Sequence, residues 1–234
     1  MPATTDARAW TPYRPRALTQ RDERVWTVDD DIPGITGVTR RMSIVRRSDG
    51  SLLFFNAIPV PEETLAAVRS LGTPAALIVP NRYHALDAAP FAEKLGVPAF
   101  APAVAIAPLA ERVRCRPISE LPADAVVQVV TIDGFSTDEV CLVIGGTLIV
   151  GDVVTNAPHG RGLYALMMRF IGFTGPEPRL PPPVRKRVGR DMNVLRRNLR
   201  ALAQTPGLAR LIPSHGDVFE GNVPAALERI AAGV

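Results

Sequence analysis

Short apolar runs bounded by turn-forming residues constrain the fold of this chain more than any other feature. Ala75–Val79 is apolar throughout, and such a run is typical of a strand buried on both faces of a sheet. A second group of β-rich runs follows, two of which are joined by Gly145-Gly146 as in a meander. Its members are residues 126–132, 140–144 and 147–150, and a last buried run covers residues 208–212. The chain must therefore build sheets whose faces are both covered.

Amphipathic patterns between these runs predict the covering helices. Pro61–Leu71 opens with a proline and two acids, which suit the first turn of a helix. A second helix over residues 88–95 stops at Gly96. Apolar side chains then recur every three or four residues over 188–202, and a final helix covers 223–230.

The order of these elements favours two stacked sheets with helices outside, an αββα sandwich in the α/β (α+β) class. A hairpin over residues 42–55 precedes a β-α-β-α stretch, the meander, and then helix, strand and helix. A doubly wound parallel sheet is the alternative, and it fits less well because residues 102–150 hold several strands and little helix. We expect a poorly ordered arm over 1–22 and a single domain over 23–234, with a basic helical insertion at about 156–205.

Composition excludes several other classes of protein. A chain with 47% hydrophobic residues is not disordered, and two cysteines are too few for a small disulfide-held domain. No apolar run approaches the roughly 18–20 residues of a membrane-spanning helix. The N-terminus also lacks the apolar core of a signal peptide. These features predict a cytoplasmic protein without a transmembrane segment, and they leave a homo-oligomer open.

The chain has only three histidines, and all of them lie in loops that follow apolar strands or a Gly-Asp turn. They are His84, His159 and His215. Strand ends are where α/β sheets collect the residues of their sites. A lone histidine is more often solvated or structural, but three in such places favour a functional role.

Three segments resemble, in order and spacing, landmarks of the metallo-β-lactamase superfamily. They are Leu77–Asp87, which ends in Asn81-Arg82-Tyr83-His84-Ala85-Leu86-Asp87; Leu148–Asp152, which ends in Gly151-Asp152; and Leu211–Asp217, which contains Ser214-His215-Gly216. In that superfamily the first loop carries a His-x-His-x-Asp-His motif, the Gly-Asp step carries a carboxylate that bridges two metal ions, and the last turn carries a final histidine. The resemblance covers residues 25–234.

The chain departs from that pattern as a divergent branch would, because most of the histidine metal ligands are missing. In the first motif only His84 remains, and Asn81 takes the first histidine position in one of two alignments. Phe135 stands where a middle histidine is expected, and a phenyl ring cannot ligate a metal. Glu139 and its acidic neighbours flank that turn and offer oxygen ligands instead. The metal ligands that the resemblance implies are His84, Asp87, Asp152 and His215, enough for one ion.

The resemblance implies a metal-dependent hydrolase of an ester, lactone or phosphoester, with a degenerate metal site and with Asp152 and His215 as catalytic residues. One divalent ion, zinc, manganese or iron, would lower the pKa of a bound water to about 7. The alternative is a non-catalytic, metal-free derivative of the fold that binds a ligand or a partner. In that case Asp152 caps backbone amides, His215 holds its own turn, and Asp87 caps the helix that follows.

Positive charge is concentrated between the two best ligand candidates. Residues 179–200, called the basic segment below, hold eight basic side chains against Asp191, a local charge of +7; because the whole chain carries +4, the rest carries −3. We expect this segment to recognise a small anionic substrate, with a solvated helix face as the simpler interpretation. The candidate substrate contacts are His159, Arg185 and Arg196. The charge is too local to be a strong signal for nucleic acid.

An apolar stretch over residues 163–173 adjoins the basic segment. A helix buried in the core is its simplest interpretation. A lid over an apolar substrate, a dimer contact and a membrane-surface segment are the alternatives.

Overall fold

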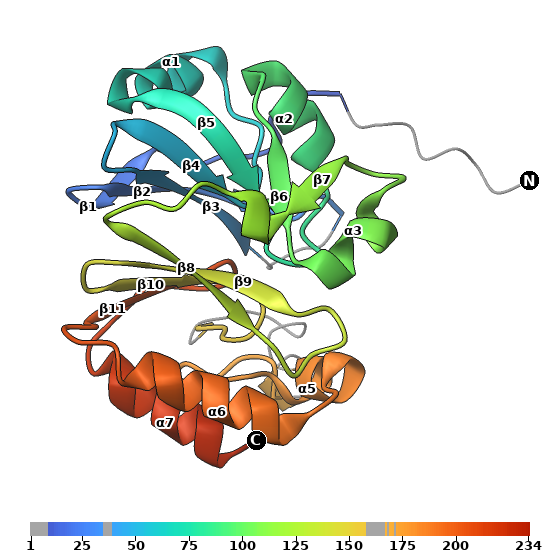
Figure 1. Ribbon diagram of the computed structural model, residues 1–234, viewed down its shortest axis with the longest axis vertical. Coiled ribbons are helices and arrows are strands. Elements are labelled where there is room, and N and C mark those ends of the chain that lie inside the picture. The colour runs from blue at the N-terminus through green and yellow to red at the C-terminus, as the bar shows by residue number, and fades with distance from the viewer. Residues whose placement is uncertain (1–8, 35–38, 158–166, 168, 171) are drawn as a thin grey trace, which may run out of the picture.

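The computed structural model describes residues 9–34, 39–157, 167, 169, 170 and 172–234. Two β-sheets face each other, and helices cover the outer face of each sheet (Figure 1). The first sheet and its helices come from the N-terminal half of the chain, and the second sheet and its helices come from the C-terminal half. The predicted αββα sandwich is confirmed.

Seven strands form the N-terminal sheet, in the order β1-β2-β3-β4-β5-β6-β7. They are β1 (Thr19–Asp22), β2 (Val25–Asp31), β3 (Thr39–Arg46), β4 (Ser51–Phe55), β5 (Thr73–Ile78), β6 (Ala99–Ala101) and β7 (Cys115–Pro117). The strands up to β4 pair antiparallel, and the pairs from β4 onward are parallel. Parallel neighbours need a crossover connection. The crossovers contain α1 (Glu62–Leu71), α2 (Ala88–Leu95) and α3 (Ala103–Leu109).

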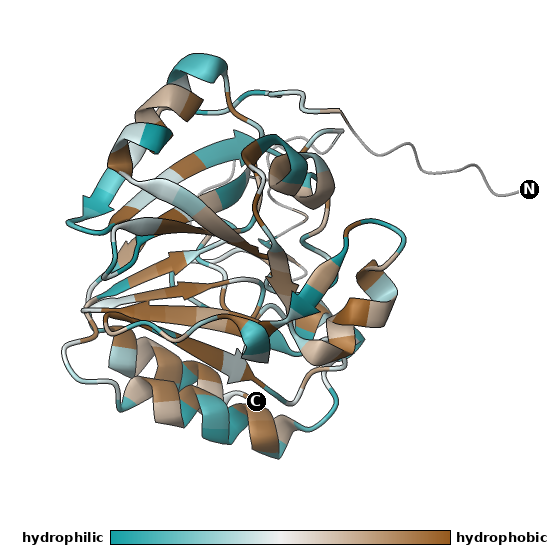
Figure 2. Cartoon of the chain, turned by 45° about the horizontal axis from the view of Figure 1, so that its top comes forward, coloured by the Kyte–Doolittle hydropathy of each residue, from teal (hydrophilic) through white to brown (hydrophobic). Residues whose placement is uncertain are grey.

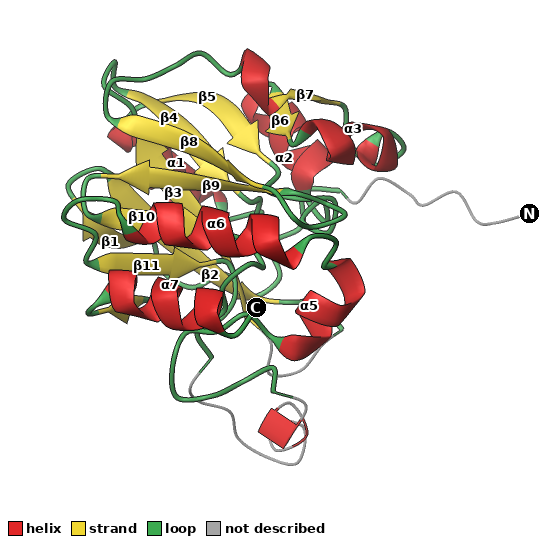
Figure 3. Ribbon diagram, turned by 60° about the horizontal axis from the view of Figure 1, so that its bottom comes forward, coloured by secondary structure: helices red, strands yellow, loops and turns green. Residues whose placement is uncertain are grey.

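Five strands form the C-terminal sheet, in the order β12-β11-β10-β9-β8. They are β8 (Val127–Ile132), β9 (Glu139–Ile144), β10 (Thr147–Val150), β11 (Arg210–Pro213) and β12 (Phe219–Glu220). The predicted meander over β8, β9 and β10 is antiparallel, whereas β10 and β11 are parallel. This half includes the helices α5 (Pro182–Val188), α6 (Met192–Ala203) and α7 (Val223–Ala232). The 3-10 turn η1 (Ile118–Glu120) lies between the two sheets in sequence. Figure 3 shows α6 and α7 side by side over this sheet.

Alternation along the strands explains why both faces of each sheet are buried. In β4, Leu53 and Phe55 belong to the core between the two sheets, while Leu52 and Phe54 belong to the core under the N-terminal helices. A third core lies between the C-terminal sheet and its helices. In Figure 2 the apolar colour is accordingly strong on the strands, whereas apolar and polar colours alternate along the helices. At roughly 25 cal/mol per Å² of apolar surface buried, these three layers are the main stabilising term.

The prediction of a poorly ordered arm over residues 1–22 is wrong at its C-terminal end. Residues 19–22 form β1 and pair with β2, and the ring of Trp10 packs against Phe91 at 5.6 Å between centroids. The indole nitrogen of Trp10 also donates a hydrogen bond to the Val60 carbonyl. The polar composition of this stretch hid a paired edge strand and one aromatic anchor. Residues 1–8 lie outside the described residues.

The helix predicted over residues 188–202 is confirmed as α6, although it begins later. Gly189 and Asp191 have extended backbone, which separates α5 from α6. The Asp191 carboxylate then caps α6 by accepting hydrogen bonds from the amides of Asn193 and Val194, at 2.9 and 3.1 Å. Among the helices of the described ranges, none has both the length and the apolar run that crossing a bilayer requires.

Candidate metal centre

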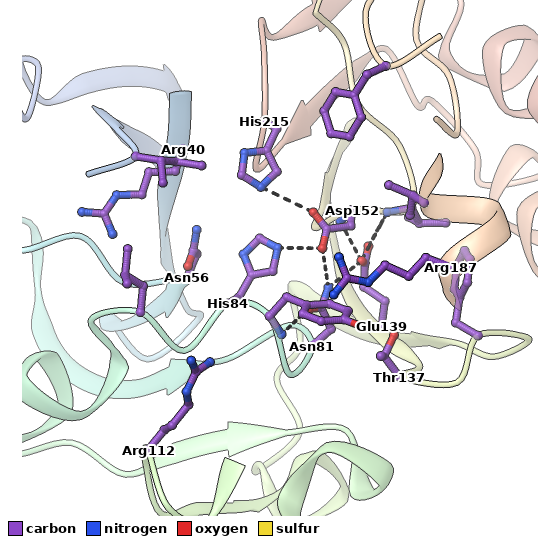
Figure 4. Close-up of a pocket in the computed structure, with 17 residues that line it drawn as sticks. Arg40, Asn56, Asn81, His84, Arg112, Thr137, Glu139, Asp152, Arg187 and His215 are labelled. Atoms are coloured by element: carbon purple, nitrogen blue, oxygen red, sulfur yellow. Dashed lines mark hydrogen bonds and ion pairs between the residues drawn. The ribbon is translucent and has the colours of Figure 1, made fainter. Parts of the chain in front are cut away.

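Three strand ends bring the candidate ligands together. His84 follows β5 of the N-terminal sheet, whereas Asp152 and His215 follow β10 and β11. These last two strands are parallel neighbours with Val150 opposite Pro213, so the residues that follow them leave the sheet at the same edge. Figure 4 shows the three side chains pointing toward one another. The site therefore lies between the two halves of the sandwich.

The Ser-His-Gly turn has its glycine for a steric reason. Gly216 has a φ of +89°, and a Cβ there would lie 2.0 Å from the carbonyl oxygen of Asn156. The turn packs so closely on Asn156 that only glycine fits. This packing fixes the backbone that carries His215.

The distances between the three side chains fit a single metal ion. His84 Nε2 lies 3.2 Å from Asp152 Oδ2, and His215 Nε2 lies 3.4 Å from Asp152 Oδ1. One ligand atom from each residue can be chosen so that all three lie within 4.8 Å of one another. A tetrahedral zinc ion with bonds of 2.0–2.1 Å holds its ligand atoms about 3.3 Å apart. Two nitrogens and one carboxylate oxygen are also a donor set that zinc accepts.

Hydrogen bonds around the site hold the ligand atoms in place. His215 Nδ1 lies 2.7 Å from the Thr39 carbonyl oxygen, which requires a proton on Nδ1 and turns Nε2 toward Asp152. On the other side, Asn81 Nδ2 donates to Asp152 Oδ2 at 3.1 Å. Asn81 thus occupies the start of the predicted motif as an orienting amide. Such partners fix the ring and carboxylate orientation that a metal would need.

Glu139 supports the Gly151-Asp152 step from below. Its buried carboxylate accepts hydrogen bonds from the backbone amides of Gly151, Asp152 and Val153, at 2.9, 2.6 and 3.2 Å, and from Asn81 Nδ2 at 3.1 Å. The Glu139 carboxylate oxygens, which the sequence offered as metal ligands, therefore accept hydrogen bonds from the backbone instead. The role of Glu139 in the described structure is to position Asp152.

Charge within this cluster shifts three pKa values. Burial, followed by the negative charge of Asp152, raises the pKa of Glu139 to about 7. Burial would also raise the pKa of Asp152, but the charges and hydrogen bonds of His84 and His215 hold it well below its usual range. Burial would lower the pKa of His215, yet its hydrogen bond to Asp152 and the charge of that carboxylate raise it. The cluster is therefore centred on an ionised Asp152.

Gly151→Ala tests whether this packing positions the site. A Cβ at Gly151 would lie 2.8 Å from the carboxylate carbon of Glu139, which its backbone hydrogen bonds keep from moving away. We expect unfolding in urea to show a loss of about 1–3 kcal/mol in stability. Gly233→Ala is the matched control, because its Cβ would meet other atoms at 3.6 Å or more and should change stability by less than about 0.5 kcal/mol. Equal stabilities of the two variants would contradict this account.

Asp87 does not belong to the cluster, so its prediction as a metal ligand is wrong. Its buried carboxylate accepts a hydrogen bond from Arg40, whose guanidinium group also contacts Asp30 at 3.0 Å. Asp87 occupies the N-cap position of α2, but its side chain makes no capping hydrogen bond, so the alternative role is wrong as well. The carboxylate instead neutralises a buried arginine that the sequence pattern did not connect with it.

Phe135 occupies the turn where a middle histidine was expected. The segment between α5 and α6 holds this turn in place. The Gly134 carbonyl accepts hydrogen bonds from the amides of Arg190 and Asp191, and Phe135 forms an isolated β-bridge with Gly189. The ring is buried and lines the cavity beside the three candidate ligands without separating them. In the part of the chain that the structure describes, His84, Asp152 and His215 are the only group of three or more His, Cys, Asp or Glu side chains close enough together to hold an ion.

Comparison with solved structures identifies the architecture. The chain superposes on FIM-1 from Pseudomonas aeruginosa in its mono-zinc form with a TM-score of 0.65 and 12% identity, over 96% of this chain and 98% of that one. For DIM-1 the TM-score is 0.63 at 12% identity, covering 94% and 98% of the two chains. A metallo-β-lactamase from Pontibacter korlensis gives 0.59 at 16% identity, covering 93% and 99%. The chain has the metallo-β-lactamase fold. No family model and no curated protein matches its sequence.

Within the metallo-β-lactamase fold of this chain, the candidate ligands open into a cavity of about 540 Å³. Its polar wall includes Asn81, Glu139 and the three candidate ligands, and its apolar wall includes Ile32, Leu86, Val153, Phe173 and Val184. Arg40, Arg112 and Arg187 also line it. Sequence reasoning missed Arg112, because nothing in its neighbourhood marks a site, and it chose other members of the basic segment over Arg187.

Two of the predicted substrate contacts are wrong. Arg185 donates to the Gly233 carbonyl at 2.6 Å, and Arg196 donates to the carbonyls of Ala231 and Val234. Both therefore hold the end of α7 and do not line the cavity. The third, His159, lies outside the described residues.

The apolar stretch over residues 163–173 is described only in part. Phe173 lines the cavity, so this end of the stretch contributes to the site. Phe170 is 92% exposed, which argues against the predicted core helix at that residue.

Proposed function

We propose that this protein is a hydrolase of an ester, lactone or phosphoester that depends on one divalent metal ion. The observation that carries the proposal is the convergence of His84 Nε2, Asp152 and His215 Nε2 at the wall of an open cavity, at spacings that one ion can bridge. The mono-zinc form of FIM-1 supports it, since a protein of the same fold holds a single zinc ion. Asp152 and His215 are its proposed catalytic residues, and His84 completes the ligand set.

When bound, the ion would supply Lewis acidity and a water of lowered pKa. The chain's own residues prepare the site for it. The Thr39 carbonyl holds the proton of His215 on Nδ1 and so keeps the Nε2 lone pair free for a ligand bond. Asn81 and the Glu139-bound backbone keep Asp152 from rotating away. Apolar residues such as Val153 and Phe173 line the same cavity, and apolar surroundings strengthen electrostatic interactions with a reacting group.

The donor set bears on which metal the site prefers. Two imidazole nitrogens and one carboxylate suit zinc, and they also suit iron or manganese when water fills the remaining positions. We propose zinc first, because each histidine Nε2 lies about one tetrahedral edge from an Asp152 oxygen, 3.2 Å from Oδ2 for His84 and 3.4 Å from Oδ1 for His215. The described residues provide no second set of ligands for a two-metal site.

Metal analysis with a hydrolysis assay tests the proposal. We expect the purified protein to bind about one zinc, iron or manganese ion per chain and to hydrolyse at least one member of a panel of p-nitrophenyl esters, aryl lactones and p-nitrophenyl phosphates. Chelation should remove the activity, and adding back the metal should restore it. Protein that takes up no metal, or activity that survives full chelation, would overturn the proposal.

The affinity for zinc should depend on pH. Zinc and a proton compete for His215 Nε2, and the pKa of His215 is raised above its usual 6.5 by Asp152, despite burial. We therefore expect the apparent affinity to fall as pH decreases, with the fall beginning above pH 6.5. Competition with a chromogenic chelator, itself calibrated at each pH, measures this. An affinity that does not change between pH 8.5 and 5.5 would exclude His215 as a ligand.

A second candidate function is metal-free ligand binding. It is favoured by one observation: the contacts of Asp152 with His84 and His215 already satisfy the carboxylate when both rings carry a proton on Nε2. In that case the cavity binds its ligand without hydrolysing it. Metal uptake by Asp152→Asn separates the two functions. In the metal-dependent case the original protein takes up an ion that this variant binds much more weakly, whereas in the metal-free case neither protein takes up an ion.

A further inference from the structure

Two cavity-lining arginines have no role in the site as described so far. Arg40 is different, because Asp30 and Asp87 neutralise it. The guanidinium groups of Arg112 and Arg187 make no ion pair or hydrogen bond with another residue in the part of the chain that the structure describes. Each is exposed and available to a ligand.

These two arginines approach the cavity from different halves of the sandwich. Arg112 follows α3 beside the N-terminal sheet, and Arg187 lies on α5 below the C-terminal sheet. Figure 4 shows both side chains directed toward the cavity that His84, Asp152 and His215 also line. Both arginines and the three candidate ligands therefore line one cavity.

Tyr83 holds Arg187 at the cavity wall. The guanidinium carbon of Arg187 lies 5.4 Å from the centroid of the Tyr83 ring, and Tyr83 directly precedes His84. Arg82 contacts the same ring at 5.0 Å and donates to the tyrosine hydroxyl. A cation–π contact uses the face of the guanidinium plane and leaves its N–H groups free to donate in that plane. Tyr83 thus orients Arg187, whose guanidinium N–H groups have no acceptor among the described residues.

The charges in the cavity favour an anion. Backbone amides bind Glu139, and the two histidines contact Asp152, so neither carboxylate neutralises Arg112 or Arg187. Guanidinium groups bind carboxylates and phosphates through short, charge-assisted hydrogen bonds. The remaining wall is largely apolar, with Leu86 and Phe173 among its residues.

We infer that Arg112 and Arg187 form an anion subsite, and that the substrate carries a carboxylate or phosphate group on an apolar body. This inference rests on the proposed function, since it places the hydrolysed group at the metal centre and the anionic group at the arginines. It also explains which part of the basic segment serves the site: Arg187 does, whereas Arg185 and Arg196 hold α7.

Binding of small probes tests the subsite without measuring activity. By isothermal titration calorimetry on the purified protein, 4-phenylbutyrate and phenyl phosphate should bind at least tenfold more tightly than the neutral 4-phenylbutanamide. Arg187→Met and Arg112→Met should each weaken binding of both anions about tenfold or more, and leave that of the amide within about twofold. Equal affinity for anion and amide would overturn the inference.

Arg197→Met is the matched control, because it removes one arginine charge from an exposed position of the same basic segment outside the cavity. It should change anion affinity by less than about twofold at 0.15 M salt, where distant charges are screened. A loss equal to that of Arg187→Met would show general charge attraction and overturn the subsite.

Repeating the titrations on Asp152→Asn separates this inference from the proposed function. Anion binding that persists there and still requires Arg187 supports the subsite, even if the protein binds no metal. Anion binding that vanishes there but ignores Arg187→Met would place the anion on the metal, which overturns the subsite and leaves the proposed function standing.

Discussion

Asp152→Asn is expected to raise the dissociation constant for zinc at least about 100-fold and to abolish hydrolysis. Asp152 makes a polar contact with each of the other two candidate ligands, at 3.2 Å from His84 and 3.4 Å from His215. Its carboxylate is also the only negative charge that the set offers to a cation. Mutating a residue that only orients a metal ligand typically weakens metal binding about 10–100-fold. Removing the ligand itself should weaken zinc binding by more than that. Chelator competition measures the constant.

Asp133→Asn is the matched control for this variant. It makes the same chemical change at an exposed position that is not among the clustered ligands. We expect its zinc affinity and its hydrolysis to stay within about twofold of those of the original protein. If Asp152→Asn bound zinc as tightly as Asp133→Asn, Asp152 would not be a ligand.

Arg40→Met is expected to lower the free energy of unfolding by about 3–5 kcal/mol. Arg40 has a side chain that is 6% exposed and is paired with Asp30 and Asp87, at 0% and 4%. Removing the guanidinium group would leave Asp87 without its partner and Asp30 with only the backbone amides of Arg14 and Asp31. Buried charges that have lost their counter-charge carry a cost of this size. Urea denaturation of metal-free protein measures the loss.

Two further variants separate charge burial from other effects of this substitution. Arg200→Met breaks an exposed pair with Glu228, which should cost less than about 1 kcal/mol. Adding Asp30→Asn and Asp87→Asn to Arg40→Met should recover part of the lost stability, because the orphaned charges are gone. A loss for Arg40→Met as small as that for Arg200→Met would contradict the account of this buried cluster.

The fold could be predicted from the sequence because its signals are local. Apolar runs such as Ala75–Val79 have the length of a strand, and the spacing of apolar residues in α6 matches the pitch of a helix. The order of these strands and helices along the chain then favoured an αββα sandwich, in which both faces of each sheet are covered. The short α3 was missed, because Pro108 inside it argues against a helix.

The candidate site could be predicted only where a residue follows a recognisable strand end. His84, Asp152 and His215 meet that condition, and they cluster. Asp87 was assigned wrongly, because its partner Arg40 lies 47 residues away in the sequence and no local pattern connects the two. Arg112 was missed because no local pattern marks a site near it, and Arg187 was passed over for other arginines of the basic segment. Which arginine of a basic run lines a cavity depends on the side of the helix from which it projects. The number of charges in the run does not predict that side.

The account stands on His84, Asp152 and His215 holding one metal ion in common. Anomalous X-ray diffraction from crystals grown with zinc, with data collected above and below the zinc absorption edge, tests this most directly. The account predicts one strong zinc peak in contact with all three side chains. A cavity without a peak at saturating zinc, or a zinc ion bound elsewhere while these three residues keep only their mutual contacts, would contradict it.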